Sequence, residues 1–87
     1  MAEVLGRDQP VPASVVAVVE RVLLAEGYVI TTNPYVLSSI TFCLVDGVWS
    51  ELEPPAVGSK VLLENIRRHS LGLRAYKAMP APEGQDR

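Results

Sequence analysis

The chain has 87 residues, of which 48% are hydrophobic and 21% are charged, and it carries a formal net charge of -2. This length supports one small domain, and the composition is that of a globular protein rather than a disordered one. The acidic balance gives no electrostatic argument for nucleic-acid binding, and no apolar run reaches the roughly twenty residues that a membrane span requires.

The two ends of the chain differ in composition from its middle. Residues 1–12 contain a glycine and two prolines among mixed polar residues, with neither the basic start nor the apolar centre of a signal peptide, and we expect a flexible leader. Residues 81–87 are mostly polar and are expected to form a flexible tail, which leaves residues 13–80 as the domain. The single cysteine, Cys43, cannot form an internal disulfide, which favours a reducing intracellular compartment, and we expect the cytoplasm.

The first element, Ser14–Leu24, is compatible with two structures. Ala17 and the flanking Ala13 and Ala25 favour a helix, and the serine at the start of the run would cap it. Its β-branched residues favour a strand, because a helix restricts their side chains; these are Val15, Val16, Val18, Val19 and Val22. We favour the strand, with Glu26-Gly27 as the turn that follows it.

Two strands are predicted next, at Gly27–Thr31 and Ser39–Val45, because Val, Ile, Thr, Tyr and Phe dominate both runs. Asn33-Pro34 separates them, since proline fixes its own backbone angle and keeps the preceding residue out of the helical region. In the second run Ile40, Phe42 and Leu44 alternate with more polar positions, so Phe42 is predicted to be a core residue.

The rest of the chain contains a loop and two further candidate strands. Pro54-Pro55 excludes a regular strand after Gly47, and we expect a loop with one helical turn at Trp49–Leu52. Val61–Arg68 fits either a helix or a strand, and Leu71–Met79 fits a strand in which Gly72 marks a bulge or a close approach of the backbone. Five short strands over about seventy residues predict an all-β barrel or sandwich.

The order of these pieces resembles a known family. The segments AVVERVLLAEGYVI, SSITFCLVDGV and VGSKVLLENIRRHSLGLRAYKAMP are similar to the cold-shock type of OB-fold domain. The chain looks most like the divergent cold-shock-like modules of Armitage-type piRNA-pathway RNA helicases and of a related testis-antigen family. This resemblance implies a five-stranded OB-fold barrel, makes both ambiguous runs strands, and suggests that the chain is part of a larger RNA-processing protein.

The same resemblance implies that several base-stacking positions are altered. Such domains bind single strands by stacking bases on exposed aromatic side chains. Laid along the family pattern, Tyr28 keeps one aromatic, while Arg21 and Glu26 stand where other rings are usual. Thr41 and Cys43 occupy positions that usually carry an aromatic and a histidine. Each stacked base contributes roughly 1–3 kcal/mol, so we expect weak rather than tight binding.

Positive charge is concentrated in the last third of the chain. Arg67, Arg68 and Arg74, with Lys60, His69 and Lys77, can contact phosphates, or they can simply form a solvated hairpin. Arg74 precedes Ala75, which should point inward, so its guanidinium should lie outside. By the same alternation Tyr76 is predicted on an outer face.

The remaining aromatic residues are ambiguous. Tyr28 is either a stacking platform or a packing residue. Trp49 can replace a loop aromatic at the ligand site or plug one end of the barrel, and Tyr35 is an exposed loop aromatic by its place beside Pro34.

No pattern of residues predicts catalysis or a cofactor. Cys43 and His69 are the only residues of their types, which is too few for a zinc site, and the glutamates form no recognisable acid–base pair. We therefore expect no enzymatic activity, metal site or cofactor.

Two hypotheses of function follow. The first is a non-catalytic module that makes weak, salt-dependent contacts with RNA or single-stranded DNA; its contact residues would be Arg21, Tyr28, Trp49, Arg67, Arg68 and Arg74. The second is a protein-interaction barrel in which the nucleic-acid face is lost. That barrel would use Tyr35, Val45, Val48 and Trp49 together with an exposed strand edge.

Overall fold

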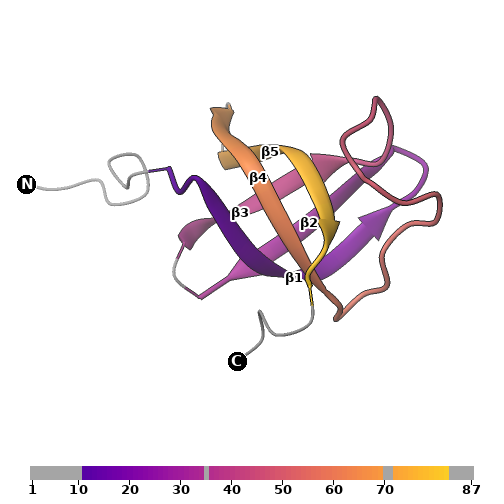
Figure 1. The fold of residues 1–87 in the computed structure, drawn as a ribbon, viewed down its shortest axis with the longest axis horizontal. Helices are drawn as coiled ribbons and strands as arrows, with labels where there is room; N and C mark the ends of the chain where they lie inside the picture. The colour runs from indigo at the N-terminus through magenta and orange to yellow at the C-terminus, as the bar shows by residue number, and fades with distance from the viewer. Residues whose placement is uncertain (1–10, 35, 70–71, 83–87) are drawn as a thin grey trace, which may run out of the picture.

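The computed structural model describes residues 11–34, 36–69 and 72–82, without the side chains of residues 37 and 38. Five strands close into a barrel in the order β1-β2-β3-β5-β4 (Figure 1). Their bounds are β1 Ser14–Leu23, β2 Tyr28–Asn33, β3 Val36–Cys43, β4 Lys60–His69 and β5 Gly72–Pro80. The predicted all-β, five-stranded barrel of the OB type is confirmed, while the expected leader and tail fall almost wholly outside the described residues.

Strand β1 divides its length between two neighbouring strands. Its first half, Ser14–Val18, pairs with β4, and Val18–Leu23 pairs with β2, both antiparallel. The register shifts between Val19 and Arg21, and such a bulge bends a strand from one neighbour to the next. The strand prediction for this segment is therefore confirmed, and the β-branched residues outweigh the alanines and the capping serine.

Strands β2 and β3 form a hairpin that is tighter than the sequence predicted. Asn33 pairs with Val36, so β3 begins three residues before the predicted start at Ser39. Pro34 therefore interrupts the pairing of β2 with β3 only at the turn between them. Strand β3 also ends early, at Cys43, because Asp46 and Gly47 turn the chain with positive φ angles of 64° and 77°.

Each strand has two neighbours within the described part of the chain. Strand β3 pairs with β5 in parallel, β4 pairs with β5 antiparallel, and β1 closes the ring through β4. Closure gives every described strand a neighbour on both sides, but β3 pairs with β5 only at Ile40–Phe42. The exposed strand edge expected by the protein-interaction hypothesis is therefore limited to short unpaired stretches.

The core lies inside the barrel and at one of its ends. Phe42 is fully buried, as predicted, and Thr31 is the one fully buried polar residue among those described. Its hydroxyl donates a 2.8 Å hydrogen bond to the carbonyl oxygen of Ile40, which satisfies a group that would otherwise be costly to bury. The other buried side chains are Ala17, Val19, Val29, Ile40, Val48, Trp49, Val61, Leu63, Ile66, Leu73, Ala75 and Ala78.

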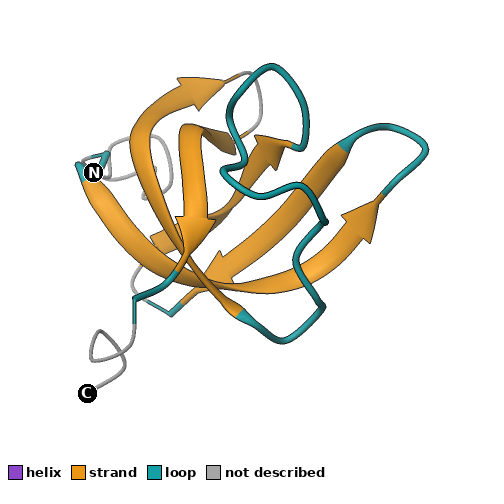
Figure 2. Ribbon diagram, turned by 45° about the vertical axis from the view of Figure 1, so that its right-hand side comes forward, coloured by secondary structure: helices purple, strands orange, loops and turns teal. Residues whose placement is uncertain are grey.

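Residues 44–59 form a loop that runs along one end of the barrel, from β3 to β4 (Figure 2). The helical turn predicted at Trp49–Leu52 is wrong, because Trp49 instead makes a parallel bridge with Ala78 of β5. The backbone N–H of Ser50 donates to the carbonyl of Ala78 at 3.0 Å, so the loop is fixed to β5 by sheet-like hydrogen bonds. No helix in the described ranges is long and apolar enough to cross a bilayer.

The alternation of buried and exposed side chains along β4 and β5 is broken at one point in each strand. Leu63 and Ile66 of β4 are both buried although they are three residues apart, and so are Ala75 and Ala78 of β5. Between them Asn65 has a φ of 54°, a left-handed conformation that asparagine tolerates better than most residues. This local change keeps Ile66 inside and puts the side chain of Arg67 outside. The bulge predicted at Gly72 is wrong: Gly72 pairs regularly with His69.

Candidate functional site on the strand face

The outer surface of the barrel carries a row of residues that runs across all five strands. Register pairs connect Arg21 of β1 to Ile30, Ile30 to Thr41, Thr41 to Arg74, and Arg74 to Arg67 of β4. Arg21 and Arg67 are exposed, and the neighbours of the other three residues along their strands are buried, so the five side chains point outward. We call these residues the arginine row, because three of the five are arginines.

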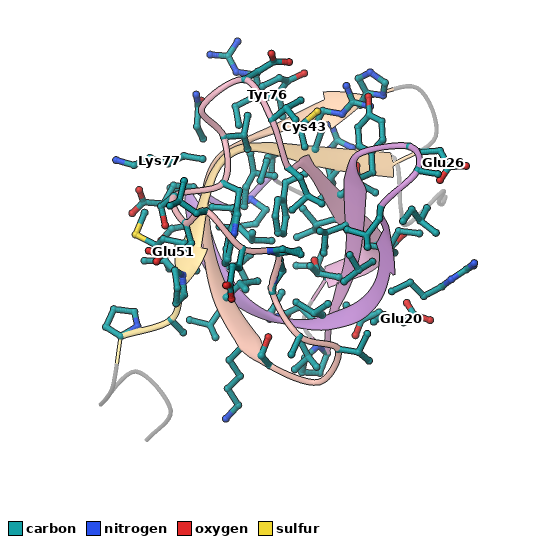
Figure 3. All side chains as sticks on the ribbon, turned by 90° about the vertical axis from the view of Figure 1, so that its right-hand side faces the viewer. Glu20, Glu26, Cys43, Glu51, Tyr76 and Lys77 are labelled. Carbon is teal, nitrogen blue, oxygen red and sulfur yellow. The ribbon has the colours of Figure 1, made fainter. Side chains whose placement is uncertain are left out.

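A second row lies one pleat further along the strands. Leu23 pairs with Tyr28, and Tyr28 pairs with Cys43. Because Phe42 pairs in parallel with Ala75, Tyr76 follows beside Cys43, and Figure 3 shows both side chains on the same side of the barrel. Leu23, Tyr28, Cys43 and Tyr76 are the tyrosine row. Tyr76 is 41% exposed, which confirms its predicted outward position.

The two rows are joined by contacts between cations and rings. The Cζ atom of Arg74 lies over the Tyr28 ring at 5.0 Å from its centroid, so this arginine reaches from β5 across β3 to β2. The Cζ atom of Arg67 lies over the Tyr76 ring at 5.9 Å. Such contacts contribute about 0.5–1 kcal/mol at exposed sites. Each guanidinium is therefore held above a ring, where its outer face can stack on a planar ligand.

The arginine side chains have few hydrogen-bond partners of their own. The Nε atom of Arg74 is buried and has no hydrogen-bond partner among the described residues. The Nε–H of Arg67 donates only a long hydrogen bond, 3.4 Å, to the side-chain oxygen of Asn65. A planar guanidinium whose N–H groups are not engaged by carboxylates is suited to accept an external anion.

Charge is unevenly distributed along the chain. Strands β4 and β5 carry five lysines and arginines against one glutamate, a net charge of +4. That glutamate, Glu64, pairs with Lys77 at 3.7 Å rather than with an arginine. Residues 44–59 carry three carboxylates and no lysine or arginine. The net charge of -2 is therefore the sum of a cationic pair of strands, an acidic loop and the rest of the chain. A bound polyanion would interact mainly with the local charge of the surface that it contacts.

The structure brings together four of the six residues that the sequence analysis selected. Arg21, Tyr28, Arg67 and Arg74 share the outward face of the two rows. Arg68 is exposed but pairs with Leu73, whose side chain is buried, so Arg68 leaves β4 on the opposite side from Arg67.

Trp49 lies in the core rather than on the face. Its side chain is 8% exposed, and its ring stacks on Phe42 with a centroid distance of 5.5 Å and an interplanar angle of 24°. Its indole N–H donates to the carbonyl oxygen of Glu53 at 2.7 Å. This is the barrel-plugging alternative of the two that the sequence left open for this residue, and it leaves the ring little surface for a ligand.

Tyr76 is the residue of the site that sequence reasoning did not select. Its outward position followed from alternation, but its proximity to Arg67 depends on the pairing of β4 with β5. Tyr35, the other aromatic considered, lies outside the described residues. In the described part of the chain no group of three or more His, Cys, Asp or Glu side chains is placed to hold a metal ion.

The chain was compared with protein families, with curated proteins and with solved structures. No family model, curated protein or solved structure matches the chain.

Proposed function

We propose that this barrel is a non-catalytic binding module for single-stranded nucleic acid, RNA or single-stranded DNA. The observation that carries the proposal is the pair of adjoining rows, in which three arginines and two tyrosines share one outward face and are linked by two cation–ring contacts. Aromatic rings and guanidinium planes stack on bases of any sequence, and arginine N–H groups bind phosphates. The contacts would be weak, salt-dependent and tolerant of sequence.

The strength of binding follows from the number of platforms. Two tyrosines, each beside an arginine, offer two stacking positions, and a stacked base contributes about 1–3 kcal/mol. Part of this is lost, because each ring already has a guanidinium above it. We therefore expect dissociation constants in the micromolar range or weaker at moderate salt.

The setting of the module is part of the proposal. The resemblance of the sequence to cold-shock-like modules supports a place within a larger RNA-processing protein. The solitary, partly exposed Cys43 supports an intracellular and cytoplasmic location, where a thiol stays reduced.

The test is a titration of labelled polypyrimidine RNA at low salt, followed by the backbone amide resonances of the protein. The shifts should concentrate on the residues of the two rows. The emission of Trp49 is a poor reporter of this event, because its ring is buried against Phe42. No shift at high micromolar protein would retire the nucleic-acid function.

The double variant Arg67→Glu with Arg68→Glu extends the test. It inverts two charges of β4 and should abolish binding if phosphate contacts supply the affinity. Unchanged affinity would remove both residues from the contact surface.

A protein-interaction role is the second candidate, and one observation favours it. Four large apolar side chains are more than half exposed in the β1–β2 turn and in the loop of residues 44–59: Leu24, Val45, Leu52 and Val57. Val48 and Trp49, which the sequence analysis assigned to this surface, are instead buried. A partner bound here would shift loop amides and leave the two rows unchanged, so the same spectra separate the two functions.

A further inference from the structure

Arg67 and Arg74 face each other directly across β4 and β5. They form a register pair, and both side chains point outward. Directly opposite residues of an antiparallel pair have Cβ atoms about 4.5–5.5 Å apart, and like charges in this position destabilise the sheet. The nearest carboxylate of these two strands, Glu64, is engaged with Lys77. Within β4 and β5 as described, the fold therefore places two cations side by side with no carboxylate paired to either of them.

The arrangement of the two guanidinium groups fits a single oxyanion. Both lean along the strands in the same direction, each over a tyrosine of the neighbouring row. One face of each guanidinium lies against a ring. Among the described residues Nε of Arg67 makes only the long contact with Asn65, whereas Nε of Arg74 is buried, so Arg74 would bind an anion through its terminal N–H groups. Stacking uses the face of a guanidinium and hydrogen bonding uses its edge, so both can operate at once.

We propose that Arg67 and Arg74 together hold one phosphate of a single-stranded nucleic acid, with the bases on either side of that phosphate placed over Tyr28 and Tyr76. This rests on the proposed function and deepens it, because it assigns a phosphate seat on β4–β5 and adds Tyr76 as a second platform. The two rings beside the seat favour a phosphodiester flanked by bases over a phosphate that carries none. Arginine is suited to such a seat by its bidentate N–H groups.

Arg21 provides the internal comparison. It stands in the same row but three strand spacings from Arg74, about 14 Å at 4.7–4.9 Å for each spacing. It cannot share a phosphate with the other two arginines. The arginine row would therefore bind two phosphates, one at the Arg67–Arg74 pair and one at Arg21.

The experiment measures how the affinity for oligouridylate depends on salt. For single strands the slope of log K against log salt is about -0.7 for each neutralised phosphate. The double variant Arg67→Gln with Arg74→Gln should reduce the magnitude of the slope by about 0.7, although two charges are removed. Adding Arg21→Gln should bring the reduction to about 1.4.

Other results overturn the inference. A reduction of about 1.4 for the double variant alone would mean two separate phosphates, and no reduction would mean none. Wild-type protein that binds no oligouridylate would overturn the proposed function itself, which is a distinguishable failure.

Two controls separate the phosphate seat from a structural role and from a general polyanion site. The variant Arg67→Lys with Arg74→Lys keeps the charges and should keep the wild-type slope; a slope as low as that of the glutamine variant would assign the effect to structure. Linear polyphosphate has charge without bases, so it should bind more weakly than oligouridylate and be insensitive to Tyr76→Ala. Equal binding of polyphosphate would overturn the assignment to nucleic acid.

Discussion

The strand face and the loop end of this barrel use aromatic residues in opposite ways. On the face, Tyr28 and Tyr76 keep part of their surface in solvent and lie beneath arginines. At the loop end, Trp49 is buried on Phe42 and held by a hydrogen bond within its own loop. The charges differ as well, since β4 and β5 carry +4 and the loop of residues 44–59 carries -3.

This difference teaches which aromatic residues serve folding and which are available for binding. Each ring contributes to stability in proportion to its buried area, so a ring in the core contributes most, whereas a partly exposed ring contributes less and keeps a surface for a ligand. Substitutions at the loop end should therefore change the free energy of unfolding. Substitutions on the face should change affinity, and the four predictions below test this division.

The largest effect is expected at the loop end. Trp49→Ala removes a buried indole and leaves a cavity against Phe42, so it should lower the free energy of unfolding by about 3–5 kcal/mol. That is a large share of the 5–15 kcal/mol typical of a whole domain. Urea denaturation followed by circular dichroism measures it. The matched control is Tyr76→Ala, which should cost less than Trp49→Ala, because Tyr76 is 41% exposed and lies on the outer face rather than in the core. If the two variants lose the same free energy of unfolding, the proposed division between folding and binding residues is wrong.

The second prediction concerns affinity. Tyr28→Ala removes a ring that supports Arg74 and should weaken oligouridylate binding by about 1–3 kcal/mol, measured by fluorescence anisotropy with labelled RNA. Leu52→Ala, which removes a fully exposed apolar side chain from the loop, should leave the affinity unchanged. The reverse result, with Leu52 sensitive and Tyr28 insensitive, would move the binding surface to the loop end.

The third prediction sharpens the boundary of the cationic face. Arg67→Glu should weaken binding about tenfold, or about 1.4 kcal/mol, because it places an anion in the arginine row. Arg68→Glu makes the same charge change one residue away, on the opposite side of β4, and should have the smaller effect at 0.1 M salt, where the Debye length is about 10 Å. Equal effects would mean that binding senses only the general field of β4.

The smallest effect is expected at the phase change of β4. Asn65→Ala should lower the free energy of unfolding by about 1 kcal/mol, because alanine disfavours the left-handed conformation at a φ of 54°. Asn65→Gly should retain more stability, since glycine adopts this conformation without the steric cost. Thermal denaturation of the two variants makes the comparison. If the alanine variant is the more stable, the backbone conformation is not what fixes the position of Arg67.

The strands could largely be predicted from residue types, but their irregularities could not. The helix-like spacing of Leu63 and Ile66 left that segment ambiguous in the sequence, and the structure explains the spacing by Asn65 and its positive φ. At Trp49 a helical turn was expected from the sequence, yet backbone hydrogen bonds to Ala78 decide the conformation. A bond to a residue almost thirty positions away leaves no signal in the local pattern.

Residue types and their alternation are enough to predict β-strands, the inward position of Phe42 and Ala75, and the outward position of Tyr76, because side chains alternate with a period of two along a strand. The alignment of Arg21, Arg74 and Arg67 in one row, without Arg68, follows from how the strands pair. The reason is that cross-strand register depends on pairing between segments distant in the chain. A shift of one residue in the register of any one of these strands would have sent its arginine to the other face.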